Sequence, residues 1–343
     1  MKKYFQVTGL GVALYLVILL VVGSLVPMYA NAAKVKIGFV LSTLQEERYQ
    51  KDQKFFKEQA DKLGFEPVMV SAENNEQTQT AKIENLLSMG VKAIVVQPVN
   101  SEAAANLVKL AHEDKVPVVA YDRMIANAPV DFYVTMDSFK VGVLQAEAAV
   151  KATGGKGNYV ILQGQAGHSV ANEITRGVMS VLSKQKNIKI VMQKSHDGWS
   201  PQLAMQTVEN ALTQTGNKID AVLANNSGMA NGAVQALGEQ GLAGKVFVAG
   251  ADADLANIKN IVAGRQQLEV LKDIAPLAQT AAKVAYDLAT AKKPKPTRTI
   301  QNGTFSVPVM ETPVYAITKD NLEQRVISTG FHAREAVYGA AKK

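Results

Sequence analysis

Hydrophobic and polar residues follow a repeating order along the chain, in which short apolar runs alternate with longer amphipathic stretches. A short apolar run is typical of a buried strand, and apolar residues spaced about three to four positions apart are typical of a helix. Runs of the first kind lie at 34–40, 67–71, 93–97, 118–121, 132–135, 158–162, 189–193, 221–224, 246–249 and 267–271. Stretches of the second kind lie at 45–63, 75–89, 101–113, 172–184, 201–213, 229–237, 255–263 and 276–291. This alternation predicts parallel sheets with helices on both faces.

The second half of the chain repeats the order of the first. Residues 84–96 and 209–223 share one pattern of helix end, turn and apolar strand. In each half the next apolar strand then ends at an aspartate, Asp122 in the first and Asp252 in the second. Parallel strands all look alike, so a match could arise by chance, but here order, spacing and terminal aspartate agree. A chain of 343 residues suits two domains, and we expect two lobes, each a doubly wound α/β sheet.

Residues 1–33 have the features of a signal peptide. Two lysines precede a long apolar run at 10–22, and helix-breaking residues and then small residues follow it. This order of charge, apolar core and small residues predicts cleavage near Ala32 or Ala33. The alternative is an uncleaved membrane anchor, because the apolar run comes close to the length that spans a bilayer.

The amino-acid composition limits the cellular compartments in which the protein can be expected and the functions that it can have. The chain has no cysteine, which excludes disulfides and a lipid anchor on cysteine and, with the signal peptide, favours a free protein of a bacterial periplasm. The net charge is +7, but the basic residues are scattered, without the clustered face that nucleic acid requires. The sequence contains no phosphate-binding loop, zincin motif or nucleophile elbow, and its four histidines show no metal spacing. We therefore expect no enzyme activity, no cofactor and no metal ion.

Polar side chains follow the expected strands at their carboxyl ends, where ligands bind in open parallel sheets. Their mixture of acids, amides and bases suits a guest whose hydroxyls both donate and accept hydrogen bonds, such as a sugar. Taken singly, these residues have simpler roles: Asp122 and Arg123 could form a local ion pair, and Lys272 could lie in solvent. The candidates come from both halves of the chain: Gln97, Asn100, Asp122, Arg123, Gln163, His168, Asn225, Asn226, Asp252 and Lys272.

Trp199 is the only tryptophan of the chain and stands in a turn before an expected helix. A flat indole suits the apolar C–H face of a sugar ring. A tryptophan at this position could equally belong to the hydrophobic core or staple the start of the helix. The sequence alone leaves both interpretations open.

Beyond these patterns, the chain resembles the family of periplasmic pentose- and hexose-binding proteins, which includes ribose- and galactose-binding proteins, and within it the D-xylose-binding members. The resemblance covers nearly all of 34–332. Its most specific stretches are Glu47–Asp52 (ERYQKD), Ala120–Ile125 (AYDRMI), Asp197–Pro201 (DGWSP), Asp252–Ala256 (DADLA) and Thr329–His332 (TGFH).

This resemblance implies a type I periplasmic binding protein fold, in which two lobes joined by a three-segment hinge enclose a sugar. It implies a first lobe of residues 34–135 plus 271–308, a second lobe of residues 136–270 plus 309–335, and a tail at 336–343. The sugar contacts of the family then fall on Arg48, Asp122, Arg123, Trp199, Asn226, Asp252 and Lys272, with Tyr49, His168 and Asn172 as further candidates.

Part of the expected second-lobe wall departs from the D-xylose-binding pattern. His168, Val170 and Asn172 stand where those proteins have an aspartate, an asparagine and a lysine. Ser227 also replaces an aspartate, and in the first lobe Tyr49 replaces a tryptophan. The frame of the site is therefore kept, while part of its second-lobe wall differs.

The resemblance implies a monomeric binding protein that closes over a monosaccharide, D-xylose or a related pentose, and delivers it to the membrane permease of an ABC importer. We expect the free protein to be mostly open and the sugar to stabilise the closed form. Another monosaccharide or a sugar-derived signal could instead feed a chemoreceptor. A LacI-type sugar-sensing regulatory domain shares the fold, but the export signal and the lack of a helix-turn-helix before the first strand argue against it. An enzyme on a similar scaffold would need an acid and base pair, which the sequence does not offer.

Overall fold

The computed structural model describes residue 1 and residues 34–339. The predicted signal peptide at 1–33, its cleavage site and the last four residues lie outside this described part. None of the helices in 34–339 has both the length and the apolar character needed to cross a membrane. The fold below is that of residues 35–339.

The first lobe is built on a seven-stranded sheet with the order β11-β12-β5-β4-β3-β1-β2. All neighbouring strands are parallel except β11, which pairs antiparallel with β12 at the edge of the sheet. The central strands β3 and β4 are buried along their whole length, as strands covered on both faces must be. The strands are β1 (Lys36–Leu41), β2 (Glu66–Ser71), β3 (Ala93–Val96), β4 (Val118–Tyr121), β5 (Phe132–Met136), β11 (Arg298–Asn302) and β12 (Phe305–Thr312).

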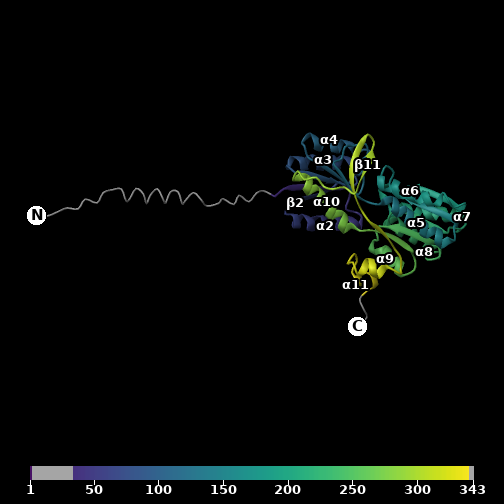
Figure 1. The fold of residues 1–343 in the computed structure, drawn as a ribbon. Helices are drawn as coiled ribbons and strands as arrows, with labels where there is room; N and C mark the ends of the chain where they lie inside the picture. The colour runs from purple at the N-terminus through teal and green to yellow at the C-terminus, as the bar shows by residue number, and fades with distance from the viewer. Residues whose placement is uncertain (2–33, 340–343) are drawn as a thin grey trace. The chain divides into compact units, whose positions relative to one another are not determined.

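Helices cover both faces of this sheet, and each face has its own hydrophobic core. Helices α2 (Glu47–Leu63) and α10 (Ile274–Ala289) pack over one core, which contains Phe39 and Phe56. Helices α3 (Glu76–Ser88) and α4 (Ala105–Glu113) cover the other, which contains Ile94. Figure 1 shows α3 and α4 together on one side of the sheet and α2 with α10 on the opposite side.

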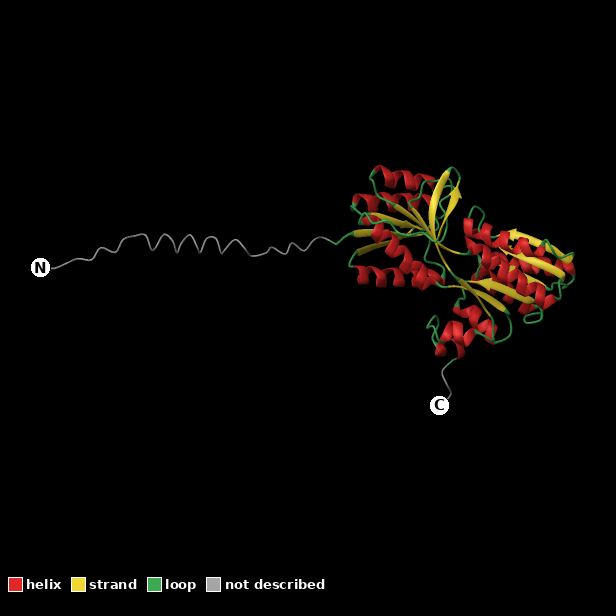
Figure 2. Cartoon of the chain, viewed as in Figure 1, coloured by secondary structure: helices red, strands yellow, loops and turns green. Residues whose placement is uncertain are grey.

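The second lobe has a six-stranded sheet with the order β13-β10-β9-β8-β6-β7. The parallel strands β10-β9-β8-β6-β7 correspond in order to β5-β4-β3-β1-β2 of the first lobe, so the repeat predicted from the sequence is confirmed, while β13 pairs antiparallel at the edge where the first lobe has the parallel β12. The strands are β6 (Lys156–Gln163), β7 (Asn187–Ser195), β8 (Ala221–Ala224), β9 (Phe247–Ala251), β10 (Leu268–Lys272) and β13 (Val314–Ile317). The helices are α5 (Ser138–Thr153), α6 (Ser169–Leu182), α7 (Pro201–Thr215), α8 (Ser227–Glu239), α9 (Leu255–Val262) and α11 (Arg334–Tyr338). Figure 2 shows the strands of each lobe lying between layers of helices.

The chain changes lobe three times, and each crossing is a single residue between two elements. Asp137 separates β5 from α5, Asp273 separates β10 from α10, and Pro313 separates β12 from β13. Both aspartates cap the helix that follows, accepting from the backbone N–H of Lys140 and Ala275. The expected lobe boundaries at 135/136, 270/271 and 308/309 lie within β5, β10 and β12, shortly before these crossings, because the strands continue to Met136, Lys272 and Thr312.

Helix α4 begins later than the sequence predicts. A serine at the start of the stretch 101–113 predicts a helix that is capped there, but residues 101–104 form turns and α4 starts at Ala105. The hydroxyl of Ser101 instead bonds Ser169 of the second lobe, and Asn100 accepts from the backbone N–H groups of Glu102 and Ala103. A polar residue that bonds another lobe cannot serve as the local cap.

Helices α5 and α6 cross at very short range through two glycines. A Cβ atom on Gly142 of α5 would lie 1.9 Å from the carbonyl oxygen of Ile174, and one on Gly177 of α6 would lie 2.1 Å from the carbonyl oxygen of Phe139. Both obstructions are backbone atoms, which cannot turn aside as a side chain can. The second lobe therefore depends on glycine at this crossing.

We expect Gly142→Ala to lower the free energy of unfolding by about 1–3 kcal/mol, because the added methyl group forces the two helices apart. Urea unfolding followed by circular dichroism measures this loss. The matched control is Gly238→Ala in α8, where nothing lies within 4 Å of the added Cβ; it should leave stability unchanged or raise it by up to about 1 kcal/mol. Equal effects of the two substitutions would contradict the close crossing.

Candidate ligand-binding site

A small cavity lies where the carboxyl ends of the two sheets meet. The space between its lining atoms, together with its open mouth, amounts to about 230 Å³, and the lining comes equally from both lobes. All seven residues predicted as principal sugar contacts line it, together with Tyr49 and two residues that the sequence analysis did not select. The lining residues are Glu46, Arg48, Tyr49, Asp122 and Arg123 of the first lobe and Val170, Trp199, Asn226, Asp252 and Lys272 of the second.

Helix α2 supplies two of the first-lobe residues, Arg48 and Tyr49, and Glu46 directly precedes it. Within it, Arg48, Asp52, Phe56 and Ala60 are buried at intervals of four residues, so they share the face that packs on the sheet. The helix ends at Gly64, whose φ of 79° stops it with a left-handed residue. Because Arg48 lies in the first turn of this helix, its guanidinium group reaches past the strand ends into the cavity.

The two aspartates occupy equivalent places in the two lobes. Asp122 directly follows β4 and Asp252 directly follows β9, and both have positive φ, 60° and 108°. This backbone region costs free energy for residues other than glycine and tends to occur at functional sites. It is held here by the backbone, since Asp122 N–H donates to the carbonyl of Val134 and Asp252 N–H to that of Val270.

Buried charges link the two aspartates. Arg48 Nη1 lies 3.4 Å from Asp122 Oδ2 and 3.6 Å from Asp252 Oδ1, so a single guanidinium group contacts an acid of each lobe. Arg48 Nε lies 3.5 Å from Asp52 Oδ2, and Lys272 Nζ lies 2.6 Å from Asp252 Oδ1. Arg48, Asp122, Asp252 and Lys272 are only 2–4% exposed. Three acids and three bases line the cavity, so its formal charges balance.

Electrostatic pairing outweighs burial at the centre of this cluster. Burial alone would raise the pKa of Asp122, but Arg48, Lys272 and Arg123 together hold the pKa below its ordinary value. Burial likewise opposes the charge of Arg48, yet Asp122, Asp52 and Asp252 raise its pKa well above the usual range. Burial raises the pKa of Asp52 to about 6, in spite of Arg48 and of the hydrogen bond from Tyr121. Arg48 and Asp122 are therefore both charged at neutral pH.

Two buried polar atoms of the cluster have no hydrogen-bond partner among residues 34–339. They are Arg48 Nη2, a donor from the first lobe, and Asp252 Oδ1, an acceptor from the second. Lys272 Nζ lies close to Asp252 Oδ1, but the direction of approach does not make a hydrogen bond. Buried polar atoms are expensive to leave unpaired, so this donor and acceptor are ready to bond a polar guest.

A hydrogen-bond network fixes the first-lobe wall. Gln97 donates to Asp122 Oδ2 at 3.0 Å and accepts from the hydroxyl of Ser42 at 2.9 Å. Arg123 donates to the Ser42 hydroxyl at 3.1 Å and to the Tyr49 hydroxyl at 3.0 Å. Arg123 makes no ion pair with Asp122, so the local pair considered above is not formed. Gln97 is a supporting residue, outside the cavity lining.

Trp199 forms the aromatic wall of the second lobe. Its indole lines the cavity and also packs into the core of that lobe, so both interpretations of this residue are partly right. A Cβ on Gly164 would lie 2.4 Å from the indole ring, so the ring rests directly on the backbone after β6. Asn225 accepts from Gly164 N–H at 2.9 Å and holds that backbone in place.

Glu269 stabilises the two chain segments that carry Asn226 and Asp252. Its carboxylate accepts from the Ser227 hydroxyl at 2.7 Å and from the Ala253 N–H at 3.1 Å, and these residues directly follow Asn226 and Asp252. The Gln266 amide donates to the same carboxylate at 2.6 Å. Burial raises the pKa of Glu269 to about 7, even though these hydrogen bonds favour the charged form.

Several sequence-based candidates lie outside the cavity. Asn172 is exposed on α6 and does not line it. His168 is buried beside Trp199, but its ring nitrogens bond other protein groups. Asn100 and Gln163 support turns and helices near the cavity. Lys272 is buried, which excludes the alternative of a solvated lysine.

The sequence analysis missed two lining residues, Glu46 and Val170. Glu46 is the residue before α2, and burial raises the pKa of its carboxyl, opposed by Arg123. Its place next to the Glu47–Asp52 stretch was the only signal that could have identified it. Val170 gives the second-lobe wall an apolar side chain, which no search for polar strand ends would find.

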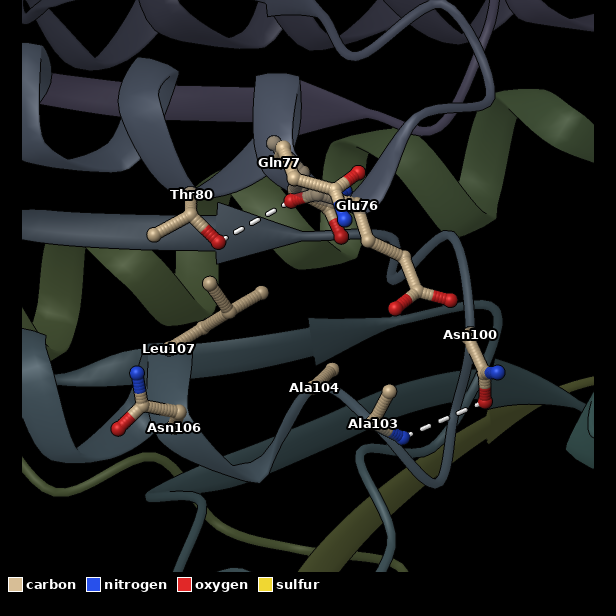
Figure 3. Close-up of a pocket in the computed structure, with 9 residues that line it drawn as sticks. Glu76, Gln77, Thr80, Asn100, Ala103, Ala104, Asn106 and Leu107 are labelled. Carbon is tan, nitrogen blue, oxygen red and sulfur yellow. Dashed lines mark hydrogen bonds between the residues drawn. The ribbon is translucent and has the colours of Figure 1, made fainter.

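A second hollow on the first lobe lies between α3 and α4. Figure 3 shows Glu76, Thr80 and Leu107 around it, with Asn100 at one end. The hydrogen bonds drawn there join Thr80 to the backbone carbonyl of Glu76 and Ala103 N–H to the Asn100 side chain. These polar groups are paired within the chain, unlike those of Arg48 and Asp252.

Two α/β lobes of equal strand order that meet over a buried, charge-balanced cavity define a two-lobed ligand-binding protein. The chain belongs to the periplasmic binding protein family: the family described as "Periplasmic binding protein domain" matches residues 37–293.

Proteins of known function resemble the chain over most of its length. It is 43% identical to the D-xylose-binding periplasmic protein of Escherichia coli (strain K12), over 88% of this chain and 92% of that protein. It is 39% identical to the D-xylose-binding periplasmic protein of Haemophilus influenzae, over 90% and 94%. Among solved structures, a carbohydrate transporter solute binding protein from Chloroflexus aurantiacus in complex with D-glucose superimposes with a TM-score of 0.81, at 28% identity, covering 88% of this chain and 97% of that one.

We expect Arg48→Met to lower the free energy of unfolding at pH 7 by about 3–5 kcal/mol, because Asp52 would then be buried without its ion-pair partner and Asp122 would lose one of the three bases that stabilise its charge. The control is Lys57→Met on the same helix, which removes an exposed pair with Asp61 and should cost less than about 1 kcal/mol. Urea unfolding measures both.

The loss of unfolding free energy in Arg48→Met should become smaller as the pH is lowered towards 4. The lowered pKa of Asp122 gives stability that is present above the pKa of the unfolded chain, about 3.9, and lost as pH falls through the folded value. Asp52, with a pKa of about 6, takes up a proton earlier and then no longer requires the guanidinium group. A difference between wild type and Arg48→Met that grows on acidification would refute this account.

Proposed function

We propose that this chain is a periplasmic sugar-binding protein that encloses a monosaccharide, D-xylose or a related pentose, between its lobes and delivers it to an ABC importer. One observation carries the proposal: a buried donor of the first lobe without a hydrogen bond, Arg48 Nη2, shares one cavity with Asp252 of the second lobe, whose Oδ1 is ion-paired with Lys272 but accepts no hydrogen bond. The names and coverage of the two D-xylose-binding relatives support the choice of sugar.

The chemistry of the lining favours a neutral polyol over an anion. The acids and bases around the cavity already balance, so a sugar acid or a sugar phosphate would add a charge without a partner. Sugar hydroxyls donate to Asp122 and Asp252 and accept from Arg48, Arg123, Lys272 and Asn226, while the indole of Trp199 takes an apolar C–H face.

The two lobes contribute equally to the lining of the site, with five residues each. Since each lobe supplies half of the lining, neither should bind sugar well alone, and binding must favour the closed arrangement. The permease of the importer, or a chemoreceptor, would bind the closed form of the protein, which we expect to be a monomer.

Binding of D-xylose is the first test. Thermal shift and calorimetry against neutral pentoses and hexoses should give a rise of several degrees with D-xylose at 100 times its dissociation constant, where a ligand adds about 2.7 kcal/mol of stability. The corresponding sugar acids should give none. A panel in which no neutral monosaccharide raises the melting temperature would refute the function.

Asp122→Ala and the isosteric Asp122→Asn should both weaken D-xylose binding by about 100-fold or more, because each removes charged hydrogen bonds worth about 1.5–3 kcal/mol apiece. The asparagine variant keeps the shape of the site and guards against misfolding. Asp197→Ala, at an exposed acid two residues from Trp199, is the matched control and should bind normally. Normal affinity in either Asp122 variant would remove this residue from the site.

The N-terminus gives a separate test of export. We propose that the signal peptide is removed, so the protein isolated from periplasmic extract should begin at Ala33 or Lys34. N-terminal sequencing or intact mass measurement decides this. A chain that keeps residues 1–33 in the membrane fraction would establish the anchor, and an intact chain in the cytoplasm would favour the sugar-sensing regulatory domain.

A further inference from the structure

His168 uses both of its ring nitrogens in contacts that connect the cavity wall to the opposite lobe. Its Nδ1 accepts a hydrogen bond of 2.9 Å from the indole N–H of Trp199, in the same lobe. Its Nε2 contacts the backbone carbonyl oxygen of Val99, in the loop after β3 of the first lobe. The imidazole is buried, with 2% of its surface exposed.

These two contacts fix the tautomer of the imidazole. A carbonyl oxygen can only accept, so Nε2 must carry the proton, and an indole N–H can only donate, so Nδ1 must be free of one. The Val99 contact exists only when the lobes meet, whereas the Trp199 contact lies within one lobe. Lobe closure therefore selects the one neutral form of His168 that can hold the indole.

The surroundings of His168 form a short strip of contacts between the lobes, which we call the lobe seam: residues 99–101 and 124 against residues 167–169. Ser169 N–H donates to the Ser101 hydroxyl at 3.2 Å, and Met124 N–H donates to the Ser169 hydroxyl at 2.9 Å. A Cβ on Gly167 would lie 3.3 Å from the Asn100 side chain. His168 is the member of this seam that also contacts the cavity wall.

We propose that His168 is a positioning residue that couples lobe closure to the placement of the Trp199 indole. It does not touch the guest, because neither ring nitrogen is free, and it acts through the wall that the guest meets. This corrects the expectation that His168 is itself a sugar contact. The sugar-dependent part of the inference rests on the proposed function.

Proton uptake should oppose this coupling. Burial and the nearby Arg123 lower the pKa of His168 to about 3, opposed by the Val99 contact and by Asp122. In an open form the solvated imidazole has a pKa near 6.5, so below about pH 6.5 closure must expel a proton. Since the closed form disfavours protonated His168, its contribution to closure is complete above pH 6.5. Between about pH 6.5 and pH 3 the equilibrium constant for closure falls by up to tenfold per pH unit.

Substitution of His168 by asparagine or by glutamine tests its contacts with Trp199 and Val99 separately. His168→Asn keeps an oxygen near the position of Nδ1 and loses the reach to Val99, whereas His168→Gln keeps an N–H near the position of Nε2 and loses the acceptor for Trp199. The mature protein contains a single tryptophan, so its emission reports on the indole directly. Stopped-flow release of D-xylose reports on the contact between the lobes.

We expect His168→Asn to release D-xylose about 2–10-fold faster, as for the loss of one hydrogen bond, with an emission spectrum close to that of the wild type. We expect His168→Gln to shift the emission spectrum and to change the release rate less. A purely structural role would alter both readouts together in both variants, in proportion to lost stability. That joint change, or an unshifted spectrum in His168→Gln, would overturn the proposal.

The sugar-free protein supplies a second arm that does not depend on the proposed function. Between pH 7 and pH 4 the emission of the wild type should change as His168 takes up a proton, and this component should be absent from His168→Asn. His196→Gln is the control, because His196 is the nearest other buried histidine in sequence and its side chain bonds only within its own lobe, to Gln163 and Thr207; its backbone carbonyl, which accepts from Trp199 N–H, is kept in the variant. Failure of every sugar to bind would refute the function alone, whereas identical pH profiles in wild type and His168→Asn would refute the role of His168.

Discussion

The ion cluster around Arg48 is the constraint on which the rest of this molecule depends. A guanidinium group placed in the first turn of α2 contacts Asp122 of its own lobe and Asp252 of the other, where solvent does not reach. Buried charges of this kind are tolerated only when they balance. The cluster therefore requires the lobes to present their aspartates at matching positions, which the equal strand order of the two sheets provides.

The backbone, more than the side chains, sets the geometry of the site. Asp122 and Asp252 leave their strands with positive φ, and hydrogen bonds from neighbouring strands and from Glu269 hold the turns that follow. Trp199, also at positive φ, rests on Gly164 and is held by His168. The walls are thus positioned before a guest arrives, which lowers the ordering cost of binding.

Much of this arrangement could be predicted from the sequence, since burial is a local signal and parallel strands place their polar ends together. Asp122, Asp252 and Lys272 were identified in that way. Arg48 was not, because a helical arginine among charged residues looks like a surface residue, and only family resemblance pointed to it. Strands β11 and β12 were missed because their partly polar sequences pair at or near a sheet edge, and β13 was missed because it is a run of only four residues. The role of Ser101 depends on the other lobe, which no local pattern encodes.

Because backbone hydrogen bonds hold the two aspartates in place, the ligand specificity of such a protein can change independently of them. Val170 lines the cavity from α6 with an apolar side chain, which makes no hydrogen bond to the turns that carry Asp122 and Asp252. New nutrient preferences could therefore arise by drift or by laboratory selection at a few wall positions, while the charged frame and the scaffold are inherited intact.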